Sequence, residues 1–161
     1  MSDAPTDRNA PASDDEKRRR VIELAFDGDE AAFRKFCETI QAEVPEGTTA
    51  VLRGSSITGE RYDDGAPFDA DGPGTSDLDL TLVGDEIFEF YSLTGSYIPG
   101  VHTMPMGEDH PDIAPKLEPL RERLVAMVGR PVNIQASRDL FMYIRGELIG
   151  QPYLTLFGKV G

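Results

Sequence analysis

The sequence predicts one α/β (α+β) domain in which a small mixed sheet is flanked by helices. Apolar residues recur at helical spacing in four stretches, 14–26, 30–44, 113–127 and 139–148. Short apolar runs with β-branched residues, typical of strands, occupy 48–53, 77–83, 131–136 and 153–157. Because the two patterns alternate along 161 residues, about the length of one domain, we expect helices packed on a sheet of few strands.

The first two predicted helices are separated by Asp27-Gly28-Asp29, and the second is expected to end before Pro45. Asp29 suits the start of that second helix, because its carboxylate can accept a hydrogen bond from the N–H groups of the first turn. Cys37 falls in the same helix beside Phe36, which indicates a buried small apolar residue. A single cysteine excludes an internal disulfide and fits a reducing cytosol.

Residues 1–13 and 14–161 are expected to behave differently. The first segment is predicted to be a disordered tail, since its Pro, Ala, Ser and Asp residues cannot bury enough apolar surface to offset the entropy of ordering, and the second is predicted to be a single domain. The net charge of −13 argues against extended binding to DNA or RNA, which depends on Lys and Arg. With no run as long as a membrane span and no apolar signal segment, we expect a cytoplasmic protein without a membrane partner.

The chain between the second and third predicted strands is less regular. Residues 86–91 suit either a strand or a short helix, and 92–111 is expected to be a long loop that is a functional lid or disordered. His102 and His110 lie there among acidic residues, but without regular ligand spacing they are interpreted as surface residues rather than a zinc site. If this loop closes over a substrate, Met104-Pro105-Met106 would form an apolar wall.

Asp77 and Asp79 stand two residues apart at the start of the second predicted strand. Since side chains alternate faces along a strand, both carboxylates are expected on one face, opposite Leu78 and Leu80. Two carboxylates about 7 Å apart along a strand suit Mg²⁺ or Mn²⁺, because these hard cations take oxygen ligands. The alternative interpretation is that both are solvated surface acids in a chain with 29 acidic residues.

Gly54-Ser55-Ser56 directly follows the first predicted strand and is expected to lead into a short helix. Glycine lets a backbone approach an anion closely, and serine hydroxyls and N–H groups at a helix start bind phosphate oxygens. Arg53 immediately precedes this element and is the arginine best placed to contact a phosphate. The other arginines considered as phosphate partners are Arg61, Arg121, Arg123, Arg130 and Arg138.

Taken together, Arg53-Gly54-Ser55-Ser56 and the later Ser76-Asp77-Leu78-Asp79-Leu80 resemble the signature of the DNA polymerase beta-like nucleotidyltransferase superfamily. The likeness covers 48–136 and includes no recognisable polynucleotide-binding domain. It implies a nucleotidyltransferase-like fold in which Gly54 and Ser55 bind the triphosphate of ATP or another NTP, and we expect the flanking Arg53 and Ser56 to take part in nucleotide binding. It also implies that Asp77 and Asp79 are the catalytic carboxylates that bind the magnesium ions.

Two features depart from the superfamily pattern. The segment 56–76 between the motifs is longer than usual, and its Asp-rich pieces are expected to form an inserted turn or hairpin rather than a calcium loop. The position that usually carries a third carboxylate is matched by Asn133, which would border the acceptor side. An asparagine can ligate a metal through oxygen but cannot accept a proton as a general base. The substrate, solvent or another acid would supply that base, and the acids considered are Asp109, Asp112 and Asp139.

The expected function is therefore a magnesium-dependent nucleotidyltransferase that transfers a nucleoside monophosphate from an NTP to a hydroxyl of a small molecule, protein or RNA end. The acidic balance favours a small-molecule or protein acceptor over a long nucleic acid. One alternative is a catalytically inactive nucleotidyltransferase-fold module that binds nucleotide or another protein. A further alternative is a globular domain whose acids are only surface charge.

Overall fold

The computed structural model describes residues 13–61, 64–92, 96–98, 102–108, 110, 112–143 and 151–158. Apart from Ser13, the predicted tail therefore lies outside the described residues. The helices are α1 (Asp14–Ala25), α2 (Glu30–Glu43), α3 (Ser55–Thr58), α4 (Asp85–Phe88), α5 (Glu118–Val128) and α6 (Leu140–Tyr143). The strands are β1 (Thr49–Arg53), β2 (Leu78–Val83), β3 (Ser96–Ile98), β4 (His102–Thr103), β5 (Val132–Ser137) and β6 (Tyr153–Phe157). This mixed architecture confirms the predicted fold class.

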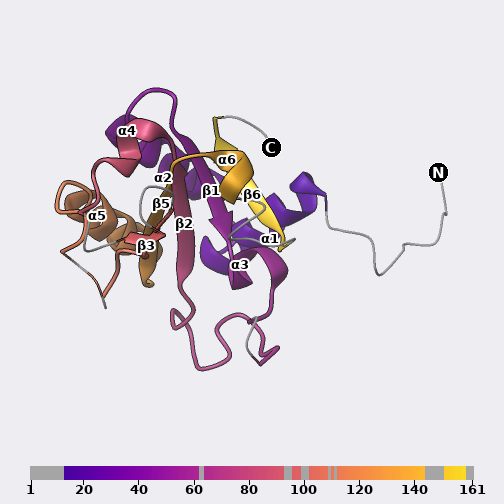
Figure 1. The fold of residues 1–161 in the computed structure, drawn as a ribbon. Helices are drawn as coiled ribbons and strands as arrows, with labels where there is room; N and C mark the ends of the chain where they lie inside the picture. Colours follow the sequence, from indigo (N-terminus) through magenta and orange to yellow (C-terminus); the bar gives the residue numbers. More distant parts are fainter. Residues whose placement is uncertain are drawn as a thin grey trace.

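The strands form a six-stranded sheet in the order β3-β4-β5-β2-β1-β6. β1 is antiparallel to β2 and β6, whereas β2 and β5 run parallel and need the long crossover through α4, β3, β4 and α5. The parallel pairing places the starts of β2 and β5 side by side, with Asp79 opposite Asn133. In Figure 1, the loop between α3 and β2 extends beyond this end of the sheet, and α4 lies at the opposite end of β2.

The main core lies on the sheet face that carries Leu78, Leu80 and Leu82, all of them fully buried. Apolar residues of α1, α2 and α5 pack in the same cluster, as the helical spacing predicts. On the opposite face, the hydroxyl of Thr81 lies 2.7 Å from the hydroxyl of Tyr143 in α6, and both side chains are fully buried. The polar face predicted for β2 is therefore covered at Thr81, and only its Asp79 end is left partly open.

Two predicted helices differ from the observed ones at their ends. Helix α5 begins at Glu118 rather than at 113, because 112–117 form turns around Pro115. Ile113 and Leu117 are buried in these turns, so the apolar spacing continues without a helix. The helix ends at Gly129, in the left-handed conformation with φ 65°, as predicted. Of the helix predicted over 139–148, the described part is α6.

The prediction of a long loop over 92–111 is wrong for its described part. β3 pairs with β4, β4 pairs with β5, and Met106 exchanges two backbone hydrogen bonds of 2.8 and 2.9 Å with Ile134. Strands of two or three residues have too few positions to show a period, so the sequence pattern could not reveal them. Met106 is fully buried and His110 is exposed, while Asp109 and the side chain of His102 lie outside the described residues.

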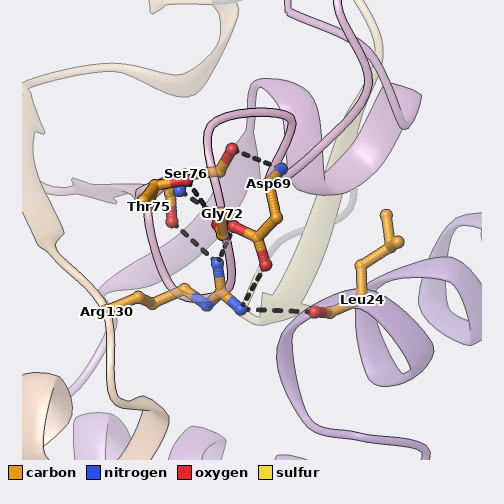
Figure 2. A network of polar contacts seen from close by, with 6 residues as sticks. All are labelled: Leu24, Asp69, Gly72, Thr75, Ser76 and Arg130. Atoms are coloured by element: carbon orange, nitrogen blue, oxygen red, sulfur yellow. Dashed lines mark hydrogen bonds and ion pairs between the residues drawn. The ribbon is translucent and has the colours of Figure 1, made fainter.

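The segment 56–76 contains α3 followed by turns, with a bridge between Glu60 and Pro67, which agrees with the predicted inserted turn or hairpin. Residues 62 and 63 lie outside the described part. Asp69 anchors the segment through a two-bond ion pair, because Nη1 and Nη2 of Arg130 donate to its two carboxylate oxygens at 2.8 and 3.1 Å (Figure 2). The hydrogen bonds from Arg130 hold the pKa of Asp69 below its ordinary value of 3.8, and burial opposes this only in part.

Replacing Asp69 with asparagine is expected to lower the free energy of unfolding at pH 7 by about 3 kcal/mol, since Arg130 would keep a buried charge without its partner. A lowered pKa stabilises the fold above the unfolded-state value and loses that contribution as pH falls through the folded value. The difference between wild type and Asp69→Asn should therefore shrink as the pH falls below about 4. Urea unfolding from pH 7 to pH 2 measures it. Asp71→Asn, which breaks an exposed pair with Arg61, should leave the free energy of unfolding almost unchanged at every pH.

Candidate functional site

The candidate site lies where the end of β1 meets the starts of β2 and β5. In the sheet register, Arg53 of β1 is opposite Asp79 of β2, and Asp79 is opposite Asn133 of β5. Side chains that are directly opposite in neighbouring strands project from the same face of a sheet. Arg53, Asp79 and Asn133 therefore project together, on the face opposite the main core.

The side-chain amide of Asn133 holds the two predicted carboxylates together. Its Nδ2 donates one hydrogen bond of 2.7 Å to Oδ2 of Asp77 and another of 3.2 Å to Oδ1 of Asp79. Asp77 lies just before β2, so the two carboxylates approach this single nitrogen from alternate positions of one chain segment. The structure thus brings together the three residues that the sequence predicted for the metal and the acceptor side.

Gly54 adds a backbone bend beside the same carboxylates. Its φ of 90° and ψ of −158° are accessible almost only to glycine. A Cβ placed on Gly54 would lie 2.8 Å from Oδ2 of Asp79, closer than real Cβ atoms approach other groups. The Gly-Ser bend and the Asp-x-Asp strand, predicted to lie together, are therefore in direct contact.

We expect Gly54→Ala to have two effects, a loss of about 2–3 kcal/mol in the free energy of unfolding and at least tenfold weaker Mn²⁺ binding. The strain at φ 90° lowers stability, and the added methyl group would collide with Oδ2 of Asp79 and displace that carboxylate. Gly28→Ala is a matched control, because Gly28 also has a positive φ (78°) but its Cβ would contact nothing within 4 Å. That control should lose only about 1–2 kcal/mol and leave Mn²⁺ affinity unchanged. Urea unfolding and calorimetry with Mn²⁺ give the two readouts.

Burial and the charge of Asp77 raise the pKa of Asp79 to about 6. The hydrogen bond from Asn133 and the positive charge of Arg53 act in the opposite direction, but they do not cancel the increase. Burial, and after it the neighbouring charge of Asp77, therefore make the ionised form of Asp79 less favourable than that of a solvated aspartate. By contrast, Asp71 and Asp85 have side chains that are 68% and 79% exposed, as expected of solvated acids.

A divalent cation suits this donor set. Carboxylate oxygens are preferred ligands of Mg²⁺, and a cation between Asp77 and Asp79 would stabilise the ionised form of Asp79, which burial and the charge of Asp77 now disfavour. Among the described residues, no group of three or more His, Cys, Asp or Glu side chains is arranged to hold a metal ion. The protein would thus supply two carboxylates, and water and substrate phosphates would complete the coordination, as is usual for Mg²⁺.

The two serines after Gly54 have different environments. Ser55 is half-buried at the first position of α3, whereas Ser56 is fully buried and its Oγ has no hydrogen-bond partner among the described residues. The N–H groups of Ile57 and Thr58 both donate to the carbonyl of Gly54, which closes the short helix directly behind the bend. Of the two serine hydroxyls predicted to contact a nucleotide, Ser55 therefore has the more exposed position.

Arg53 is the predicted phosphate partner that lies at the site. One of its terminal nitrogens, Nη2, donates to Oε1 of Gln135 at 3.2 Å, and its Nε is buried without a partner among the described residues. The other arginines considered form ion pairs elsewhere. These pairs are Arg61 with Asp71, Arg121 with Glu118, Arg123 with Glu43, Arg130 with Asp69 and Arg138 with Asp85.

Two further residues shape the site and were missed in the sequence. Gln135, two positions after Asn133 on the same face of β5, accepts from Arg53 and donates to the carbonyl of Thr103 at 2.8 Å. Gly107 packs against Asn133 so closely that a Cβ there would collide with Oδ1 of the amide. The alternation of Asn133 and Gln135 was visible in the sequence, whereas nothing local indicated that Gly107 would reach β5.

Comparisons of the chain with protein-family models, with curated proteins and with solved structures found no match. Membership of the nucleotidyltransferase superfamily therefore stays a prediction from the two motifs. In the part of the chain that the structure describes, no helix has the length and apolar character needed to span a membrane.

Proposed function

We propose that this protein is a magnesium-dependent nucleotidyltransferase that transfers a nucleoside monophosphate from an NTP to a hydroxyl group of an acceptor. The observation that carries the proposal is the contact between the Gly54 bend and Asp79, together with the shared hydrogen bonds from Asn133 to Asp77 and Asp79. Through these contacts the Gly-Ser element, which follows β1, lies next to the Asp-x-Asp motif at the start of β2.

In the proposed reaction, Asp77 and Asp79 hold Mg²⁺ or Mn²⁺. When bound, the metal neutralises charge that develops on the phosphoryl oxygens. Gly54 and Ser55 bind the triphosphate through the backbone and a hydroxyl, and Arg53 directs its guanidinium toward a phosphate oxygen. Ser56 contributes through its backbone, because its side chain is buried.

The acceptor oxygen forms a bond to the α-phosphorus, the bond from that phosphorus to the bridging oxygen breaks, and pyrophosphate leaves. Asn133 borders the acceptor side and cannot take the hydroxyl proton, so that proton passes to solvent, to a base on the acceptor or to another acid of this chain, for which Asp109, Asp112 and Asp139 are the candidates. The net charge of −13 favours a small molecule or a protein over a long nucleic acid as acceptor.

A second candidate is a nucleotide-binding or protein-interaction module of the same fold without turnover. The amide of Asn133 favours it, because this group donates to both carboxylates at the position where the superfamily pattern expects a third carboxylate. Both candidates share metal-dependent nucleotide binding at residues 53–56, 77 and 79. They differ only in whether pyrophosphate is released.

Calorimetry with ATP, CTP, GTP and UTP, each with and without Mg²⁺, tests the shared claim, and a pyrophosphate-release assay with candidate acceptors separates the two candidates. We expect nucleotide binding that requires the metal. Pyrophosphate release that is lost in Asp77→Ala supports the enzyme, and tight binding without release supports the module. Absence of metal-dependent binding for all four nucleotides would contradict both.

A further inference from the structure

The backbone around Asp77 is fixed by the segment that leads into β5. Asp79 lies within the paired strands, but Asp77 precedes β2 and has no partner in the strand register. Instead, the carbonyl of Ser76 accepts from Nη1 of Arg130 at 2.8 Å, and the N–H of Leu78 donates to the carbonyl of Pro131 at 3.0 Å. Asp77 is thus held by a backbone hydrogen bond at each neighbouring residue.

The side chain of Arg130 is buried and contacts three separate parts of the chain. Its side chain is 7% exposed, its guanidinium lies 4.6 Å from the ring centre of Phe68, and Nη2 also lies 3.4 Å from the carbonyl of Leu24 in α1. Figure 2 shows the guanidinium between Asp69, Ser76 and Leu24. One side chain therefore connects the insert, the residue before Asp77 and helix α1.

Asp69 also holds Ser76, the residue before Asp77, through two hydrogen bonds. Its carboxylate Oδ1 accepts from the N–H of Ser76 at 2.9 Å, and its own N–H donates to Oγ of Ser76 at 2.7 Å. Asp69 has a φ of 59°, in the left-handed region that aspartate adopts more readily than most residues other than glycine. The Asp69 carboxylate thus contacts both Arg130 and Ser76, so Arg130 reaches Ser76 both directly and through Asp69.

We infer that Arg130 is a positioning residue for the candidate metal site and that, through Ser76, it sets where the carboxylate of Asp77 lies. The inference rests on the proposed function, because it assigns Asp77 to the metal. Arg130 itself touches neither metal nor nucleotide. The long insert 56–76 then has a specific role, since its Asp69 completes the brace that holds the Asp-x-Asp motif in place.

Arg121 provides a matched control for a role in stability alone. Its Nε and Nη2 donate to the two carboxylate oxygens of Glu118 at 2.9 and 2.6 Å, and its side chain is 11% exposed. This pair has the same chemistry and similar burial as the Arg130–Asp69 pair but lies along α5 without contacting Ser76. Arg130→Lys and Arg121→Lys both lose the planar two-bond geometry, so a role in stability alone predicts that folded protein of either variant binds Mn²⁺ as wild type does.

The first measurement is Mn²⁺ affinity by calorimetry on the full chain. We expect at least tenfold weaker binding for Arg130→Lys and a change of less than twofold for Arg121→Lys. Asp69→Asn, which keeps Arg130, should weaken binding severalfold and replaces Arg130→Lys in the test if that variant does not fold. Mn²⁺ binding in Arg130→Lys or Asp69→Asn that equals wild type would overturn the inference.

The second measurement needs no metal. The side-chain amide protons of Asn133 report its hydrogen bond to Asp77 by NMR, and we expect their resonances to shift and their exchange to accelerate in Arg130→Lys and Asp69→Asn but not in Arg121→Lys. If wild type binds no Mn²⁺, the proposed function fails while this signal still tests the positioning of Asp77. An Asn133 signal that is the same in wild type and in both Arg130→Lys and Asp69→Asn overturns the inference whatever the metal data show.

Discussion

Asp79→Asn is expected to abolish metal-dependent nucleotide binding, with Mn²⁺ affinity reduced at least a hundredfold, and to make the metal-free protein more stable. The first effect follows because the amide has no charge to offer a cation. The second follows because burial and the charge of Asp77 both disfavour the Asp79 carboxylate, as its raised pKa of about 6 shows. We expect the free energy of unfolding at pH 8 to rise by about 1–2 kcal/mol.

A loss of Mn²⁺ affinity together with a gain in stability would identify Asp79 as a functional residue. A substitution that damages the fold lowers stability and binding together. Asp71→Asn removes one carboxylate that is 68% exposed and should leave Mn²⁺ affinity unchanged. Calorimetry and urea unfolding on the three proteins make the comparison. If Asp79→Asn and Asp71→Asn behaved alike in metal binding, Asp77 and Asp79 would not form a metal site, as in the third interpretation of the sequence.

Asn133→Asp is expected to have the opposite effects to Asp79→Asn: the metal-free protein should become less stable, and Mn²⁺ should bind more tightly. The change replaces a donor to two carboxylates with a third carboxylate. Without metal, repulsion and the two lost hydrogen bonds should lower the free energy of unfolding by about 3 kcal/mol. With a metal present, three carboxylates should bind Mn²⁺ at least tenfold more tightly, which corresponds to about 1.4 kcal/mol or more. Excess Mg²⁺ should therefore restore much of the lost stability.

Gln135→Glu is the matched control for Asn133→Asp. Both variants add one negative charge to the same face of β5, but Gln135 bonds to Arg53 and Thr103 instead of to the two aspartates. We expect a much smaller gain in Mn²⁺ affinity for this control. Equal gains in the two variants would mean that general charge, and not the geometry at Asn133, governs cation binding. Pyrophosphate release that appears only in Asn133→Asp would favour the inactive module as the natural state.

Much of the fold could be predicted from the sequence, because apolar residues recur at regular spacing along its longer helices and strands. The helices α1 and α2 begin after residues that cap them, Ser13 and Asp29, and the strands β1, β2 and β5 lie within about a residue of their predicted bounds. Alternation along β2 also indicated that Leu78, Leu80 and Leu82 would be buried, but it did not indicate that Thr81 on the other face would be covered. The short strands β3 and β4 could not be predicted, because their pairing with β5 is a tertiary contact and leaves no local pattern.

For the candidate site too, residues with a local sequence signal could be predicted, and residues placed by tertiary contacts could not. Asp77, Asp79 and Gly54 were recognisable because two carboxylates at alternate strand positions and a glycine after a strand are local signals. The approach of Asn133 was expected only from the resemblance to a family, and the register of β2 and β5 now places it beside Asp79. The contacts of Arg130 with Asp69 and of Gly107 with Asn133 join residues far apart in the chain, so no spacing rule could indicate them.

The central claim is that Asp77, Asp79 and the Gly54-Ser55 bend together form one site for a divalent cation and a triphosphate. The most direct test is a crystal structure of the protein with Mn²⁺ and a nonhydrolysable NTP, with the anomalous signal of manganese used to locate the ion. We predict manganese bound by carboxylate oxygens of both Asp77 and Asp79, with triphosphate oxygens in contact with Gly54 and Ser55. Manganese bound elsewhere, or a nucleotide whose phosphates lie away from Gly54, would contradict the claim.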